Sequence, residues 1–321
     1  MAAVLTLREL SLNAPTGFYS KTNQLSFGGS NEFLENILPI IRDPVPLVRA
    51  AAADAFAECI KVIIDKRHRS KTALLCKIHD GVMEGLKPSL NMTAAAFGFS
   101  IDASLHGSLM VAGEMLVHTG DFMIPRFYEL CDAVLPLITR ANGVVRLAVI
   151  YLIPRLAKRC PASFERRYLS QFLDYLLSSA KPSNKKGILD VRPASLLAIG
   201  RLALVFKSKD ENNEGLHRLI TRLTEIFDAI HEGLVDDVSG LKTKYEALRC
   251  ASDIVESVGE AATDHIQLLL DHMFNSGLSE SLIHSLHSIA SNLPNMQVRC
   301  ISYILSEERA HETVILLIDY H

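Results

Sequence analysis

The sequence has no tryptophan, and aromatic residues make up only 7% of its 321 positions. The interior must therefore be filled mainly by Leu, Ile, Val and Ala, a mixture that favours helices over sheets. No apolar run reaches the roughly 18–20 residues that a membrane-spanning helix needs. Apolar residues still account for 49% of the chain and charged residues for 21%, which predicts a folded protein without a transmembrane segment.

Neither sign of charge is in large excess, since the formal net charge is only −3. That balance gives no electrostatic reason to expect nucleic acid as a partner. The six cysteines form no CxxC pair and mostly fall in apolar helical patterns, as expected for small buried residues in a reducing compartment. Because the N-terminus also lacks the charged-then-apolar order of a signal peptide, we expect a cytoplasmic protein.

Catalytic motifs are missing as well: the sequence contains no GxxxxGK[ST] phosphate-binding loop, no GxGxxG, no HExxH and no GxSxG. Asp121-Phe122-Met123 is similar to the Asp-Phe-Gly of protein kinases, but it lacks the glycine, so a helix boundary is the simpler interpretation. His284 and His287 stand one helical turn apart without a Cys pair or carboxylate at ligand spacing. We therefore expect no catalytic residue, no cofactor and no metal site in this chain.

Helical periodicity dominates what is present. Apolar side chains follow Val145 at intervals of three and four residues as far as Leu156, the stripe of a half-buried helix. Clusters of Pro, Gly, Asn and Asp divide the chain into helices, the first over 2–13. The predicted pairs are 31–42 with 47–64, 70–87 with 102–119, 122–140 with 143–159, 163–180 with 188–207, 214–232 with 241–258, and 261–275 with 279–293, and a further helix begins near Met296.

One short pattern occurs twice. Leu38-Pro39 is followed ten residues later by Val48-Arg49, and Leu135-Pro136 is followed ten residues later by Val145-Arg146. The copies lie 97 residues apart, about two periods of a 40–47-residue helical repeat. The prolines of the pattern, like Pro154, are predicted to lie within helices and bend them, unless they simply end helices. The pattern predicts an all-α fold, a single HEAT-repeat α-solenoid segment over 1–321 with about six and a half helix pairs.

An ordered set of segments resembles the N-terminal HEAT-repeat region of the target of rapamycin (TOR) kinases, which are serine/threonine kinases of the phosphatidylinositol-3-kinase-related family. The segments are Leu5–Leu10 with Ala14-Pro15-Thr16, Arg42-Asp43-Pro44 with Val48-Arg49 and Ala57-Glu58-Cys59, Ser104–Leu109 with Gly113–Leu116 and Thr119–Met123, Val145–Leu147 with Ile153–Ala157, Ala198-Ile199-Gly200, and Met273–Ser279. The resemblance extends over most of the chain. Residues 26–30 look like an insertion, and 72–77 replace a stretch that carries tryptophan in the family.

This resemblance implies a scaffold segment of a longer kinase, whose ATP-binding catalytic domain lies far downstream. We also expect the chain to be a fragment of a longer repeat array, because neither end carries the polar outer face of a terminal repeat. The implied partners are a Raptor-type substrate-recruiting subunit and a second kinase protomer, in nutrient and growth signalling. The parent complex would be cytoplasmic, with peripheral association at lysosomal or vacuolar membrane. The alternative is an independent HEAT-repeat adaptor, such as a nuclear-transport receptor or a phosphatase scaffold.

Two connections carry the candidate partner-binding residues. Lys66, Arg67 and Arg69 form the strongest basic cluster and follow a predicted helix, whose C-terminal partial charge they complement in the simpler interpretation. In the alternative, they contact an acidic partner or an anionic membrane surface. Phe97 and Phe99 flank a glycine in a predicted long loop, where they either anchor a partner or pack back onto the helices.

Overall fold

The computed structural model describes residues 2–16, 37–65, 71–87, 100–182, 189–207, 213–235 and 240–303. Within these ranges the chain forms α-helices, short 3-10 helices and tight connections, and no strand. The all-α fold predicted from the periodicity is therefore confirmed. The chain divides into two compact units, Met1–Cys160 and Pro161–His321. The expectation of one continuous solenoid with six and a half pairs stays a prediction.

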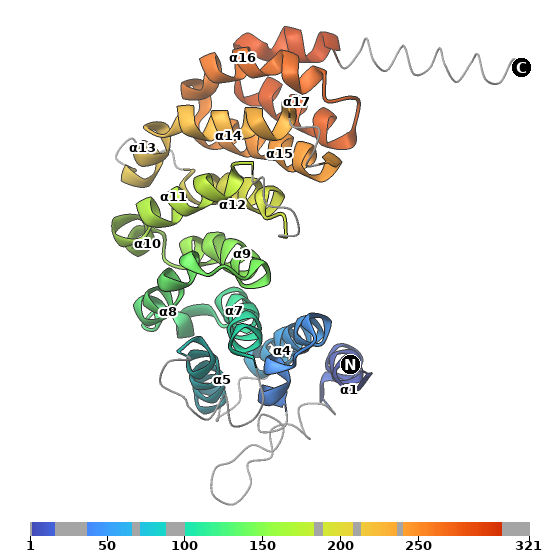
Figure 1. Ribbon diagram of the computed structural model, residues 1–321, viewed down its shortest axis with the longest axis vertical. Helices are drawn as coiled ribbons and strands as arrows, with labels where there is room; N and C mark the ends of the chain where they lie inside the picture. Colours follow the sequence, from blue (N-terminus) through green and yellow to red (C-terminus); the bar gives the residue numbers. More distant parts are fainter. Residues whose placement is uncertain are drawn as a thin grey trace, which may run out of the picture. The chain divides into compact units, whose positions relative to one another are not determined.

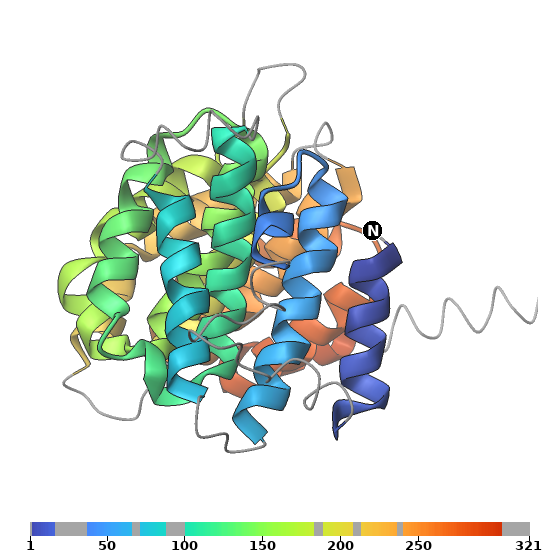
Figure 2. The ribbon, with the colours of Figure 1, turned by 90° about the horizontal axis from the view of Figure 1, so that it is seen from below.

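The first unit contains two rows of helices (Figure 1). Its B row consists of helices that pack each against the next in chain order: α1 (Ala2–Asn13), α4 (Pro46–Asp65), α7 (Ile101–His118) and α9 (Gly143–Arg159). Its A row packs against the B row and consists of η1 (Leu38–Arg42), α5 (Lys71–Leu86) and α8 (Phe127–Val134). Figure 2 shows α1, α4 and α7 side by side, with α5 next to α7. Two short 3-10 helices flank α8, namely η3 (Gly120–Met123) and η4 (Leu135–Thr139).

The second unit repeats this two-row plan. Its B row consists of α12 (Arg192–Phe206), α15 (Gly240–Val258) and α17 (Glu280–Asn292). Its A row consists of α11 (Leu169–Ala180), α14 (Leu223–Val235) and α16 (Thr263–Phe274). The shorter helices are α10 (Pro161–Arg167), α13 (Glu214–Ile220) and η5 (Gly259–Ala262). Residues 294–303 are helical too, where the sequence predicts a helix near Met296.

The Leu-Pro pattern marks a change of helix type. Pro39 and Pro136 stand at the starts of η1 and η4, and η4 directly continues α8. A proline cannot donate the backbone hydrogen bond of an α-helix interior, so the last turn tightens into a 3-10 helix. The expectation that a proline lies inside a helix is confirmed for Pro154, which lies within α9. Pro136 instead stands where the α-helical geometry of α8 ends.

Asn142 fixes the start of α9. Its side-chain oxygen accepts hydrogen bonds from the backbone N–H groups of Val144 and Val145, at 3.0 and 3.3 Å. This satisfies two of the donors that every helix N-terminus leaves open. The side-chain amide of Asn142 also donates to Asp102 in the first turn of α7, at 3.0 Å. The cap thereby ties the start of α9 to the start of its neighbour in the B row.

Gly107 lets α7 approach η1 closely. A Cβ atom at this position would lie 1.7 Å from the carbonyl oxygen of Ile41, so no larger residue fits. Gly113, on the same helix, meets only the end of a flexible side chain, because its Cβ would lie 2.6 Å from Nη1 of Arg155. The first glycine permits packing between two backbones, and the second leaves room for a guanidinium group.

Candidate functional site

All five partner-binding residues predicted from the sequence lie outside the described part of the chain. Lys66, Arg67 and Arg69 fall in the connection after α4, and Phe97 and Phe99 fall in the connection before α7. Their roles therefore stay predictions. A pocket and several charged side chains lie on the B rows instead. Arg49 belongs to the Val-Arg pattern noted in the sequence, whereas the pocket was not predicted.

Arg49 connects the start of α4 to the preceding turn and to α7. Its side chain is only 4% exposed, and Nη1 donates to the carbonyl oxygens of Asp43 and Pro44 in the turn before the helix. Its Nε donates to Nδ1 of His106 on α7, at 2.9 Å. A buried guanidinium is stable only when its donors find acceptors, and Arg49 finds three of them on two elements. Arg49 is thus a structural clamp between the B-row helices α4 and α7.

A third copy of the Val-Arg pattern opens α12. Val191-Arg192 follows Val145-Arg146 by 46 residues, one repeat period, and this spacing was the sequence signal for it. Arg192 is also only 4% exposed, and its Nε donates to the carbonyl oxygen of Ala180 at the end of α11, at 3.1 Å. Asp190 accepts the backbone N–H of Arg192 at 3.0 Å. The second unit therefore also has a buried arginine near the start of a B-row helix, but this one ties α12 to α11 in the A row.

Charged side chains cross the B row of the first unit, one from each helix. We call this set the polar line, and its members are Arg8 on α1, Asp54 on α4, Glu114 on α7 and Arg155 on α9. Burial raises the pKa of Asp54, while the charge of Arg8 opposes that shift and the charge of Glu114 adds to it. Arg155 Nη1 donates to Glu114 Oε1 at 2.7 Å, and His118 Nε2 lies 3.4 Å from Glu114 Oε2. The line couples the four helices electrostatically, with attraction between Arg8 and Asp54 and between Glu114 and Arg155, and repulsion between Asp54 and Glu114.

A pocket of about 250 Å³ lies between α7 and α9, next to the polar line. Its apolar lining comes from both helices and comprises Leu109, Met110, Leu147, Ala148 and Leu152, together with Gly113. Tyr151, which is 40% exposed, stands at its border. His106 lies at the end nearer the start of α7, and Glu114 and Arg155 lie at the other end. The pocket therefore offers an apolar floor between two polar ends.

His106 is held in one protonation state. Arg49 can only donate, so Nδ1 of His106 accepts and the ring proton is on Nε2. Burial lowers the pKa of His106 to about 4, and the neighbouring charge of Arg49 adds to that effect. At neutral pH the imidazole is uncharged and presents a fixed N–H donor to the pocket.

The second unit carries a buried carboxyl group on its own B row. Asp253 on α15 is 8% exposed, and its Oδ2 has no hydrogen-bond partner among the described residues. Burial raises its pKa to about 6, and the charge of Arg249 opposes that shift. A Cβ atom at Gly200 on α12 would lie 2.7 Å from this oxygen, so the carboxyl group presses directly against the neighbouring backbone.

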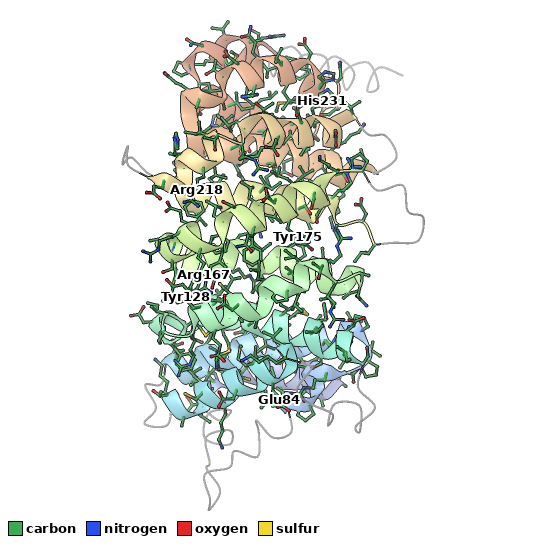
Figure 3. The ribbon with its side chains drawn as sticks, turned by 60° about the vertical axis from the view of Figure 1, so that its left-hand side comes forward. Glu84, Tyr128, Arg167, Tyr175, Arg218 and His231 are labelled. Atoms are coloured by element: carbon green, nitrogen blue, oxygen red, sulfur yellow. The ribbon has the colours of Figure 1, made fainter. Side chains whose placement is uncertain are left out.

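His231, His265 and His272 in the second unit make ring contacts. His265 stacks on Phe227 at 4.9 Å between ring centroids, and His272 lies edge-on to His231 at 4.4 Å; Figure 3 labels His231. In the described ranges, no group of three or more His, Cys, Asp or Glu side chains could hold a metal ion.

Asp121-Phe122-Met123 falls in η3, where Asp121 pairs with Arg159 at 3.0 Å. Among the described helices, none is both long and apolar enough to cross a membrane.

Two-row stacks of helix pairs define the class of this protein, an all-α solenoid of the HEAT type. Solved structures support that assignment. The crystal structure of Kap121p bound to Pho4p is similar with a TM-score of 0.60, and that of the karyopherin Kap121p bound to the extreme C-terminus of the protein phosphatase Cdc14p with 0.59. Both matches cover 96% of this chain and 34% of the other chain, at 12% identity. At that identity they show the fold alone.

Sequence comparison then identifies the relatives. The chain is 30% identical over 315 residues to the serine/threonine-protein kinase TOR of Arabidopsis thaliana and 28% identical over 296 residues to tor1 of Schizosaccharomyces pombe. These matches cover 95% and 92% of this chain but only 11% of each relative. No protein-family model matches the chain. The chain is therefore related, over nearly its whole length, to a segment of the TOR kinases, and the resemblance predicted from the sequence is confirmed.

Proposed function

We propose that this chain is the N-terminal scaffold segment of a TOR-type serine/threonine kinase. The observation that carries the proposal is the match to TOR kinases along 95% of the chain, combined with a helical-repeat fold. In such a protein the catalytic domain, with its ATP, belongs to a distant part of the parent. The segment itself then needs no cofactor.

The proposed mechanism is geometric. Arg49 ties α4 to α7 and Arg192 ties α12 to α11, which helps the surfaces of these helices to keep a constant spacing within each unit. A Raptor-type subunit and the second kinase protomer bind to such surfaces and are thereby held at fixed positions relative to the active site. The parent complex then works in the cytoplasm, peripherally at lysosomal or vacuolar membrane.

A binding assay tests the partner part of the proposal. The purified 321-residue chain is immobilised and exposed to the Raptor-type subunit of the same organism. We expect retention, with an at least fivefold loss when Lys66, Arg67 and Arg69 are all changed to Glu, because charge reversal opposes an acidic partner. The matched control reverses Lys185 and Lys186, a second basic connection, and should leave retention unchanged. Failure of the unaltered chain to retain the subunit would contradict this part of the proposal.

An independent adaptor is the second candidate, and the likeness to karyopherin structures favours it. The titles of those structures describe complexes with Pho4p and with the C-terminus of Cdc14p, so a similar fold can hold a protein segment. An adaptor would act without a kinase domain in the same polypeptide. The two candidates therefore differ in what the parent reading frame encodes downstream.

A further inference from the structure

The size of the α7–α9 pocket restricts what it can bind. Its volume of about 250 Å³ is smaller than the roughly 300–1,000 Å³ of sites for small-molecule ligands and cofactors. Its floor is formed by the apolar side chains of Leu109, Met110, Leu147 and Leu152. An apolar hollow of this size suits a single large side chain from a protein partner, and anchoring residues at interfaces typically fill such pockets.

The polar end of the pocket has an open cationic group. Glu114 is 20% exposed and already has two cationic or donor neighbours, Arg155 and His118. Arg155 is 41% exposed and pairs with Glu114 through Nη1, and within the described part of the chain its Nη2 and Nε have no hydrogen-bond partner. Lys158, exposed one turn further along α9, adds positive charge on that side. The group that this end can still accept is therefore a carboxylate.

The opposite end of the pocket supplies a neutral donor. His106 is fixed by Arg49 with its proton on Nε2, so it can donate to a backbone carbonyl but cannot pair with a cation. His106 and Glu114 are eight residues apart on α7, which corresponds to about 12 Å along the helix. The middle of the pocket is then about 6 Å from the cationic end, or about two residues of extended chain.

We propose that the α7–α9 pocket binds a short linear segment of a partner protein, in which an aliphatic or aromatic side chain enters the pocket and an acidic residue two positions away pairs with Arg155. A backbone carbonyl of the segment accepts from Nε2 of His106. This inference rests on the proposed scaffold function and adds the class of partner segment that one of its surfaces recognises.

Synthetic peptides test the inference directly. Fluorescent peptides in a Gly-Ser background carry one Leu, Met, Phe or Tyr and one Asp, separated by zero to three residues, and their binding to the 321-residue chain is followed by anisotropy. We expect binding to be strongest when one residue separates the two. Replacing the apolar residue by Ser or the Asp by Asn should weaken binding about tenfold, because each change removes one of the two anchors. Absence of binding by every peptide up to about 1 mM would overturn the inference.

Variants of the chain locate the binding. Arg155→Gln should weaken the Asp peptide about tenfold and leave its Asn counterpart unchanged, and Ala148→Phe should block both by filling the pocket. Lys158→Gln is the matched control, because it removes one charge from the same helix outside the pocket lining. Equal losses in Arg155→Gln and Lys158→Gln would show non-specific attraction and overturn the inference. Circular dichroism confirms that each variant is folded.

The outcome is separable from that of the proposed function. Peptide binding uses only the purified chain, whereas the scaffold role is judged by retention of the Raptor-type subunit. If the subunit is retained equally by the unaltered chain and by Ala148→Phe while no peptide binds, the pocket proposal fails and the scaffold proposal stands.

Discussion

Two buried polar side chains show how differently single residues act in this fold. Arg49 donates to three acceptors on two elements, whereas one oxygen of Asp253 is buried without a hydrogen-bond partner among the described residues. A satisfied buried charge holds helices together, and an unsatisfied one lowers stability when it is ionised. Opposite effects are therefore expected when the two residues are replaced.

Replacing Arg49 by Ala should destabilise the first unit by about 3 kcal/mol, because three acceptors lose their donor at once. Arg49→Lys should recover less than half of that loss, since one ammonium group cannot span the turn before α4 and His106 together. Arg140→Ala, at an exposed position before α9, is the control and should stay within about 0.5 kcal/mol. Urea unfolding measures all three. An Arg49→Ala variant as stable as the control would refute the role of clamp.

Asp253→Asn should stabilise the second unit at neutral pH. The folded-state pKa of about 6 lies above the ordinary 3.8, so ionisation costs folding free energy. The cost is absent below about pH 4, grows as the pH rises through about 6, and reaches on the order of 3 kcal/mol above that. We therefore expect a higher Tm for Asp253→Asn at pH 7.5 and little difference at pH 4.

The control for this prediction is Glu260→Gln, which removes a carboxylate from an exposed position in the same unit. Its Tm should follow that of the unaltered chain at both pH values. If Asp253→Asn is less stable than the unaltered chain at pH 7.5, the carboxylate contributes a favourable interaction and the account of it is wrong.

At the scale of elements, apolar periodicity and helix-breaking residues were enough to predict most helices. The helices predicted over 47–64, 102–119 and 143–159 differ from α4, α7 and α9 by no more than one residue at either end. Predicted longer helices are broken instead: 163–180 overlaps α10 and α11, and 214–232 overlaps α13 and α14. Apolar periodicity continues across a one- or two-residue turn, so the pattern does not reveal these breaks.

The candidate site was much less predictable than the helices. The α7–α9 pocket and the polar line depend on how neighbouring helices are aligned, and periodicity within one helix carries no such information. Val191-Arg192 could have been found from the sequence, because it follows Val145-Arg146, the second copy of the Val-Arg pattern, by one repeat period. The basic and aromatic residues predicted as partner-binding candidates lie instead in connections between helices. There the sequence gives the residue types but does not indicate what their side chains contact.

Two glycines on α7 provide a test of element packing. Gly107→Ala should destabilise the chain by about 3 kcal/mol, because its Cβ would collide with the backbone oxygen of Ile41. Gly113→Ala, six residues later on the same helix, displaces only the end of Arg155 and should be neutral or slightly stabilising. Thermal unfolding compares the pair. Equal stability of the two variants would mean that α7 and η1 do not pack as closely as described.

At the scale of the whole molecule, fold and sequence comparison support different parts of the account. The likeness to karyopherins at 12% identity gives the class of fold and says nothing of a kinase. The likeness to TOR kinases extends over 95% of this chain but reaches only 11% of the relative's length. The central claim is therefore that the helices described here serve a catalytic domain encoded elsewhere in the same gene.

Sequencing the full-length transcript that encodes this chain tests the claim most directly. We predict an open reading frame that continues past His321 and encodes, far downstream, a kinase domain of the phosphatidylinositol-3-kinase-related class. A stop codon shortly after His321, in a transcript that encodes no kinase domain, would contradict it and favour the independent adaptor.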